Sequence, residues 1–262
     1  MKRILTLATI VWLEMVRRKE LYVLLILLAA LLAGLLSVDV FGLSGITGYA
    51  KDVGLLGVWL LSWILAVNIS VRQLPQEAQR GTLFPLLAMP VSRLTLILGK
   101  WLGAWSGVGF ALICFYLTLL VGVWLKGGGF DANTLVQAIL LHGGALAVVC
   151  ALGIALSTRL NRDAALVTAY ITTGSAFLLM PRIPAMLAGT RGLESVSLFG
   201  AYYLLPHFEV FDLRRRLIHD WGRVGWLLIG EILLYAFLMT VVFLTLAWLG
   251  YRKRRFSRGD VL

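Results

Sequence analysis

Apolar runs of bilayer-spanning length recur along this chain and constrain its fold more than any other feature. The runs are Leu21–Ser37, Val53–Val71, Trp101–Trp124, Leu135–Thr158, Ala164–Pro181 and Val224–Leu249. A helix needs about 20 apolar residues to cross the hydrocarbon core, and 60% of this chain is hydrophobic. Because a bilayer offers no water to the backbone, such spans fold as helices. We therefore predict an all-α polytopic membrane protein with six transmembrane helices in a single domain, residues 1–262.

Lysine and arginine are distributed unevenly between the predicted loops, and this predicts the orientation. The N-terminal segment, the loops 72–100 and 159–162 and the C-terminal tail are basic, whereas the loops around Lys51 and Lys126 are not. Basic loops remain cytoplasmic, so we expect both termini in the cytoplasm. The segment 182–223 contains six arginines, but its length and its acidic residues favour a long external loop, whose short apolar stretches could re-enter the membrane.

The net charge of +11 does not indicate nucleic-acid binding, because the basic residues flank apolar runs, as orientation signals do. Cys114 and Cys150 lie inside apolar runs and are expected to be buried thiols. Their positions predict neither a disulfide framework nor a metal site.

Residues 1–20 have the pattern of an amphipathic helix. Apolar residues recur at helical spacing, namely Ile4, Leu5, Ala8, Val11, Trp12, Met15 and Val16. We predict a helix in the cytoplasmic interface, with Trp12 at headgroup level. The alternative is an extended first span, which the charges of Glu14, Arg17 and Arg18 disfavour.

The loop of residues 73–93 is the most distinctive segment outside the spans. Pro75 is suited to start a short helix and Pro90 to end it. Its polar groups are Glu77, Arg80 and Thr82, and its apolar ones are Leu83, Phe84, Leu86 and Leu87. Such a helix can lie on the membrane surface and present a small protrusion to a partner; the alternative is a surface helix without a partner.

This loop resembles that of the permease subunits of type-2 ABC exporters. The matching residues follow the second span in order: Glu77, Gly81-Thr82, Leu86-Leu87, Pro90, Ser92-Arg93 and Gly99-Lys100. The N-terminal helix, the six spans, the long final external loop and the basic tail at residues 251–255 also agree. The resemblance therefore covers most of the chain.

The resemblance implies that the loop contains a coupling helix, which sits in a groove of a separate ATPase subunit. The transporter would contain two ATPases and two permeases, identical or different, in a bacterial inner membrane. The implied coupling residues are Glu77, Arg80, Gly81, Thr82, Leu86 and Arg93. ATP and Mg²⁺ would bind to the partner.

The sequence itself also predicts that a separate subunit binds the nucleotide. No Gly-x-x-x-x-Gly-Lys-Ser/Thr phosphate-binding motif occurs in it, and this motif is what cradles nucleotide phosphates. We therefore expect a transport subunit that is not itself an enzyme and holds no cofactor of its own.

Glycines recur at every fourth position at the start of the third span. Gly99, Gly103 and Gly107 share one helical face, where small residues allow a second helix to approach closely. Packing within one subunit is the favoured interpretation. A contact between two permeases or along the transport pathway is the alternative.

Two ionisable residues lie inside spans at similar predicted depth, Glu231 and His142. Such groups usually pair or line a wet cavity. We hypothesise a shared polar layer that includes Thr172, Thr173 or Ser175. The alternative is a protonated Glu231 that a hydroxyl group holds for packing alone.

The external run 204–216 combines aromatic and charged residues. We expect a surface helix anchored by Phe208 and Phe211. A gate at the outer exit or a site for an acidic partner is the alternative.

Two other functional classes are weaker. A secondary transporter or channel would need an ion site, for which only Glu231 is available. An intramembrane protease would rest on Gly174-Ser175 and three histidines, which lack the spacing of a catalytic or metal site. We predict the permease of an ATP-driven exporter, whose substrate the sequence leaves open.

Overall fold

The computed structural model describes residues 2–37, 46–79, 92–187, 195, 198–200, 202 and 205–252. Within these ranges every regular element is a helix. The long helices are α1 (Lys2–Arg17), α2 (Glu20–Ser37), α3 (Ile46–Gln79), α5 (Arg93–Leu125), α6 (Ala132–Ser157), α7 (Arg162–Leu179) and α11 (Trp226–Arg252). The short ones are η1 (Met180–Arg182), α8 (Ile183–Leu187), η2 (Phe208–Phe211) and α10 (Arg214–Ile218).

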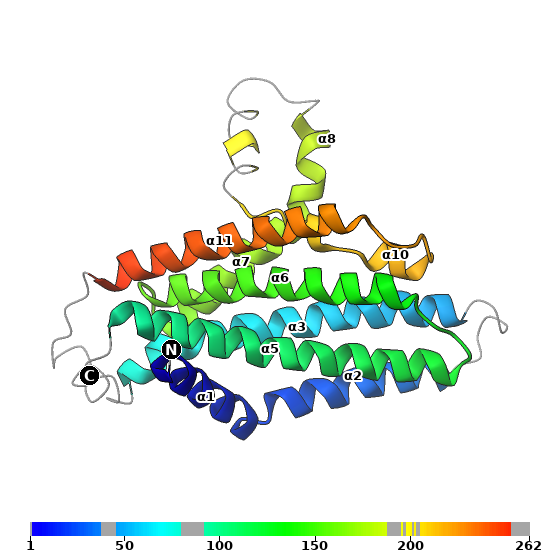
Figure 1. Cartoon of the computed structure of the whole chain (residues 1–262), viewed down its shortest axis with the longest axis horizontal. Helices are drawn as coiled ribbons and strands as arrows, with labels where there is room; N and C mark the ends of the chain where they lie inside the picture. The colour runs from blue at the N-terminus through cyan, green and yellow to red at the C-terminus, as the bar shows by residue number, and fades with distance from the viewer. Residues whose placement is uncertain are drawn as a thin grey trace.

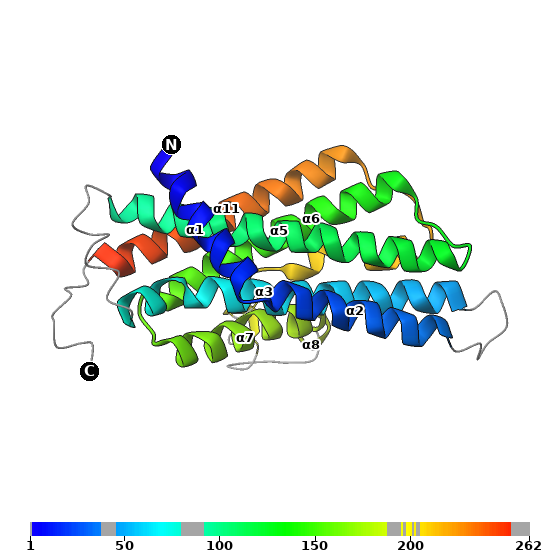
Figure 2. The ribbon, with the colours of Figure 1, turned by 90° about the horizontal axis from the view of Figure 1, so that it is seen from below.

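The long helices form an elongated bundle (Figures 1 and 2). Helices α3, α5, α6, α7 and α11 run along its long axis, α1 crosses α5 obliquely, and α8 leaves the bundle sideways. The beginnings of α1 and α5 and the ends of α3 and α11 lie at the same end of the bundle. This arrangement agrees with the prediction that the N-terminal segment and the 73–93 loop share one side of the membrane.

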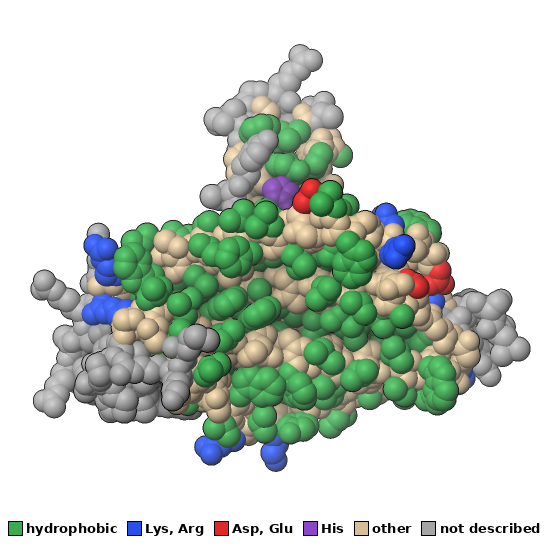
Figure 3. Space-filling model, viewed as in Figure 1, with side chains coloured by type: hydrophobic (Ala, Val, Ile, Leu, Met, Phe, Trp, Pro, Cys, Tyr) green, Lys and Arg blue, Asp and Glu red, His purple; other side chains and the backbone are tan. Residues whose placement is uncertain are grey.

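Five helical segments are long and apolar enough to cross a membrane: Gly48–Pro75, Arg93–Leu125, Ala132–Ser157, Arg162–Leu187 and Trp226–Arg252. The apolar part of α2, Glu20–Gly34, is shorter, so the count of six spans remains a prediction. Hydrophobic side chains cover the side of the bundle (Figure 3), and Lys and Arg lie at its ends and beneath α1 and α2. This surface is that of an integral membrane protein.

Helix α6 lies at the centre of the bundle, where it contacts α3, α5, α7 and α11. All residues from Ala145 to Ile154 are buried, as expected for a helix that is apolar on every face. Its N-terminus is capped by Asp131, whose carboxylate accepts from the Thr134 N–H at 2.9 Å. Hydrogen bonds from the Thr134 hydroxyl and from the Thr134 N–H lower the pKa of Asp131. Cys150 is buried, as predicted, whereas Cys114 is only half-buried.

The glycine face of α5 packs against α1. A Cβ atom on Gly103 would lie 2.9 Å from both the Cα and the carbonyl oxygen of Ala8, so the two backbones are in contact there. Gly99 faces the side chain of Leu7, and Gly107 faces the side chain of Met15. The structure thus shows these glycines in contact within one subunit. Whether α1 lies in the membrane interface remains a prediction.

Two local predictions were wrong. Pro75 does not begin a separate helix: α3 continues through it to Gln79, with Gln73 and Leu74 buried, and a helix packed among its neighbours tolerates proline. The run 204–216 is not a surface helix either. It contains η2 and α10, and Phe208 and Phe211 are buried in the core.

Candidate functional site

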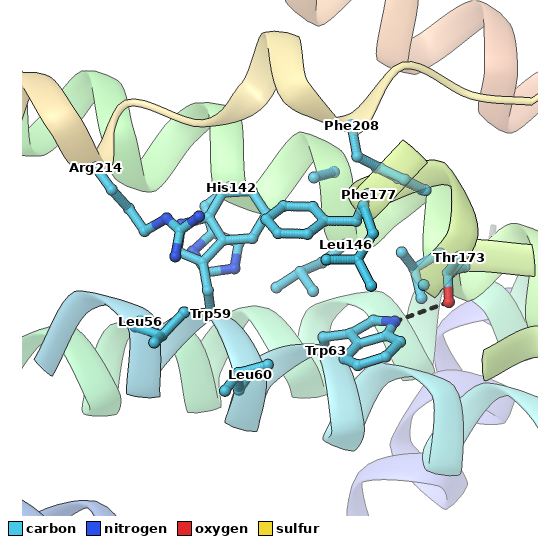
Figure 4. A pocket seen from close by; sticks show the side chains of 14 residues that line it. Leu56, Trp59, Leu60, Trp63, His142, Leu146, Thr173, Phe177, Phe208 and Arg214 are labelled. Carbon is cyan, nitrogen blue, oxygen red and sulfur yellow. Dashed lines mark hydrogen bonds between the residues drawn. The ribbon is translucent and has the colours of Figure 1, made fainter. Parts of the chain in front are cut away.

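A cavity of about 200 Å³ opens between α3, α6, α7 and the segment that contains η2 and α10. Four aromatic side chains dominate its wall: Trp59, Trp63, Phe177 and Phe208. Its polar lining consists of His142, Thr173 and Arg214. We call this cavity the aromatic pocket (Figure 4).

Helical periodicity explains why these side chains converge. Leu56, Trp59, Leu60 and Trp63 of α3 follow the spacing i, i+3, i+4, i+7 and therefore form one stripe. Thr173 and Phe177 of α7 are four residues apart and face this stripe. The pocket is thus built mainly from one face of each of two helices.

His142 is fully buried against the inner wall of the pocket. Its ring stacks on Trp59, with centroids 4.0 Å apart and planes 9° from parallel. Its Nε2 atom lies 2.9 Å from the Ser62 hydroxyl, and its Nδ1 atom lies 3.4 Å from the Tyr116 hydroxyl. Both ring nitrogens therefore have partners, from α3 and α5.

A second hydrogen-bonded pair joins α3 to α7. The Trp63 indole N–H donates to the Thr173 hydroxyl at 2.8 Å (Figure 4). That hydroxyl in turn donates to the Ala169 carbonyl at 2.6 Å. The polar atoms of both lining residues are therefore used within the protein.

Arg214 places a guanidinium group at one end of the pocket. It lies over the Trp59 ring at 5.6 Å and over the Phe177 ring at 5.5 Å, within the range of cation–π attraction. Its Nε and Nη2 atoms donate to the two carboxylate oxygens of Asp212, at 3.0 Å and 2.7 Å. This bidentate pair balances the charge of Arg214.

The predicted polar layer of Glu231 with His142 is not formed. Glu231 is exposed, because the buried face of α11 contains Ile229, Ala236 and Thr240 and a residue two positions after Ile229 points the other way. His142 faces α3 and α5 instead.

Of the hydroxyl residues proposed for that layer, only Thr173 reaches the pocket. Thr172 and Ser175 do not line it, and the Ser175 hydroxyl donates to the Thr172 carbonyl at 3.0 Å. Trp59, Trp63 and Arg214 were not predicted as site residues from the sequence. The helical stripe of α3, with its two tryptophans four residues apart, was the signal that could have revealed the first two.

The predicted coupling residues are only partly within the described structure. Glu77 belongs to the last turn of α3, whereas Arg80, Gly81, Thr82 and Leu86 lie outside the described residues. The two flanks of the loop are described, and each contains an arginine that binds another helix.

On the first flank, buried Arg72 of α3 forms an ion pair with Glu20, the first residue of α2. On the second flank, Arg93 begins α5, which Ser92 caps by accepting from the Thr95 N–H at 3.1 Å. The Arg93 guanidinium donates to the carbonyl oxygens of Tyr251 and Arg252 at 2.6 Å and 2.7 Å. Both acceptors belong to the last turn of α11, whose carbonyls lack partners within the helix.

Comparison with known proteins supplies the family. Residues 10–181, more than half of the chain, match the model of the ABC-2 family transporter proteins. No curated protein matches the sequence. The helical bundle and its apolar surface agree with this family match. The chain therefore belongs to the ABC-2 transporter family, as the permease that forms a membrane component of an ABC transporter.

Proposed function

We propose that this permease is the membrane subunit of an ATP-driven exporter and that a separate ATPase drives it through the 73–93 loop. The observation that carries the proposal is the position of this loop in an ABC-2 permease. It joins α3 to α5 at the end of the bundle where α1 begins and α11 ends. The sequence contains no phosphate-binding motif, which supports a partner subunit that binds the nucleotide.

The two flanking arginines supply a mechanical route from the loop to the spans. A push on the end of α3 passes to α2 through Arg72 and Glu20. A push on the start of α5 passes to the end of α11 through Arg93. The C-terminus of a helix carries a partial negative charge, so the Arg93 contact has an electrostatic component as well as two hydrogen bonds.

Helix α3 also connects the loop to the aromatic pocket. Arg72 follows Trp63 by nine residues on the same helix, a distance of roughly 14 Å along its axis. A rigid displacement or rotation of α3 therefore moves one wall of the pocket relative to α7. In this proposal the pocket is where the permease holds its substrate before export.

The remaining parts of the proposal follow the family resemblance. Two ATPases would bind two permeases, the same or different, in a bacterial inner membrane with both permease termini in the cytoplasm. Secondary transport gains no support, because Glu231 is exposed and has no polar partner within the described residues. A protease gains none either, because the Ser175 hydroxyl bonds to the backbone.

Copurification of the ATPase tests the coupling assignment. An ATPase encoded next to the permease should copurify with it, and Glu77→Arg combined with Gly81→Trp should abolish this. A matched control is Lys126→Glu with Gly129→Trp, which makes the same kinds of change in exposed residues after α5. The assignment fails if the ATPase remains bound to the first variant or is lost from the control.

Direction of transport needs a second assay. Inverted membrane vesicles expose the cytoplasmic side, so an exporter should accumulate substrate in them when ATP is added. Accumulation only in right-side-out vesicles loaded with ATP would indicate import and overturn this part of the proposal.

A further inference from the structure

We infer that the aromatic pocket binds a neutral, ring-containing apolar molecule, which reaches it from within the membrane. The inference rests on the proposed function, because it names the substrate class of the pocket assigned above. Three features carry it: the satisfied polar groups of the wall, the balanced charge of Arg214 and the apolar mouth.

The wall offers little to a polar ligand. Both nitrogens of His142 have partners, and Trp63 and Thr173 bond to each other. A ligand that carried polar groups into the pocket would lose their hydration and find few partners there. Burying a polar group without a compensating hydrogen bond costs roughly 2–7 kcal/mol.

The wall also disfavours charge of either sign. Asp212 binds Arg214 through both carboxylate oxygens, so an anion would have to compete with this pair or leave the site with a net negative charge. A cation would approach the guanidinium group of Arg214 itself. Desolvated charges need partners, and Arg214, the one charged residue among the described residues that line the pocket, already has its charge balanced by Asp212.

The remaining surface favours rings. Trp59, Trp63, Phe177 and Phe208 line the cavity, and aromatic rings pair in offset or edge-on arrangements that stabilise them beyond simple burial. The volume of about 200 Å³ lies below the roughly 300–1,000 Å³ typical of sites for drug-sized ligands. The pocket therefore holds a small molecule or one end of a larger one.

The mouth of the pocket indicates the route. Leu56 and Leu60 of α3 are 42% and 44% exposed, and Leu178 of α7 is 62% exposed. All three also line the pocket, so its rim is aliphatic and lies on the side of the bundle. A rim of this kind faces hydrocarbon rather than water, and a ligand dissolved in the membrane can enter across it.

A pair of fluorescent probes tests the charge preference. N-phenylnaphthylamine is neutral, whereas anilinonaphthalenesulfonate has the same ring system with an added sulfonate. The assay uses the permease–ATPase complex in lipid nanodiscs and measures energy transfer from tryptophan to the probe, with empty nanodiscs subtracted. We expect saturable binding of the neutral probe and a dissociation constant for the sulfonate that is about ten-fold higher or more.

Glycine variants test the location. Gly174 of α7 lines the pocket, and a Cβ atom on it would lie 3.6 Å from the Trp63 ring. Gly174→Leu fills the pocket and should weaken neutral-probe binding about ten-fold. Gly109→Leu is the matched control, because Gly109 lines a separate hollow beside α5 and has no atom within 4 Å of its Cβ position.

The outcomes separate this inference from the proposed function. Equal or tighter binding of the sulfonate, or full binding by a folded Gly174→Leu variant, would overturn the neutral aromatic ligand. If Gly174→Leu does not fold, the comparison of probes on the unmodified complex still decides. Probe binding without any copurifying ATPase would refute the proposed function alone, and a bound ATPase without saturable probe binding would refute this inference alone.

Discussion

The guanidinium group of Arg93, at the start of α5, donates a 2.6 Å hydrogen bond to the backbone carbonyl of Tyr251, in the last turn of α11. It also lies 5.7 Å from the centroid of the Tyr251 ring. These residues are far apart in sequence, and their contact ties the end of the 73–93 loop to the last span. The permease thus has a direct connection between the segment proposed to receive the ATPase motion and a helix that borders the interior of the bundle.

Arg93→Ala should uncouple ATP hydrolysis from transport. The variant loses both hydrogen bonds to the α11 terminus, so displacement of the loop would no longer move α11. We expect the number of substrate molecules transported per ATP to fall about ten-fold, equivalent to 1.4 kcal/mol of lost coupling. The ratio is measured in reconstituted vesicles.

A matched control for this experiment is Arg252→Ala. Arg252 is exposed and lies over the Trp248 ring at 5.3 Å, a contact worth about 0.5–1 kcal/mol at such sites. Its backbone carbonyl, which Arg93 binds, is retained. An unchanged transport ratio in Arg93→Ala, or an equal loss in the control, would contradict the role of Arg93.

Arg72→Leu should destabilise the permease more than the double variant that also replaces its partner, Glu20→Leu. Arg72 is buried, and its side chain pairs with Glu20, which is about a third exposed. Breaking a buried pair costs about 3–5 kcal/mol, and the exposure of Glu20 reduces this to roughly 2 kcal/mol. The double variant Arg72→Leu, Glu20→Leu should recover part of the loss.

Unfolding by sodium dodecyl sulfate in mixed micelles measures this cycle. A coupling energy of about 1–3 kcal/mol between the two positions is expected for residues in direct contact. Strict additivity of the two single substitutions would show that the ion pair does not contribute to stability.

Gly103→Ala should loosen α1 from α5. The new Cβ would lie 2.9 Å from backbone atoms of Ala8, so the two helices must move apart, at a cost of about 1–3 kcal/mol. Gly109→Ala on the same helix meets no atom within 4 Å and should be neutral or stabilising. A crosslink by a short bifunctional maleimide between cysteines placed at Trp12 and Ser106, whose side chains now hydrogen-bond at 2.9 Å, would form more slowly in the Gly103 variant. Equal rates in both glycine variants would argue against close backbone packing.

Thr173→Val should destabilise the permease through an orphaned donor. The Trp63 N–H would lose its partner, and an unsatisfied buried donor costs about 1–3 kcal/mol. Adding Trp63→Phe removes the donor as well and should return much of the stability. A double variant less stable than Thr173→Val alone would show that ring size rather than the hydrogen bond decides.

The long helices could be predicted well from the sequence. The direction in which their side chains point could not. Span length depends only on the apolar run, so α5, α6, α7 and α11 each overlap their predicted segments. Depth along a helix also follows from residue counts. The direction in which a side chain points within the bundle depends on packing, and for this reason Glu231 and His142 were predicted to share a layer that they do not share.

The segment after α7 was the other point that sequence alone could not resolve. Phe208 and Phe211 occur beside charged residues, which suggested a surface helix. Both rings are buried, because the chain returns to the bundle there and fills the space beside α6 and α7. Arg214 reaches the aromatic pocket by the same return. A pattern of local residues carries no information about such a return.

Site-specific crosslinking measures the coupling of the permease to its ATPase most directly. After replacement of Cys114 and Cys150, a single cysteine is placed at Thr82 in the loop or at Gly129 beyond the end of α5, and a short crosslinker is applied to native membranes. We predict a crosslink to an ATPase subunit from position 82, increased or decreased by ATP, and none from position 129. A crosslink from position 129 alone, or labelling of position 82 by an impermeant maleimide added outside intact cells, would contradict a permease driven from its 73–93 loop.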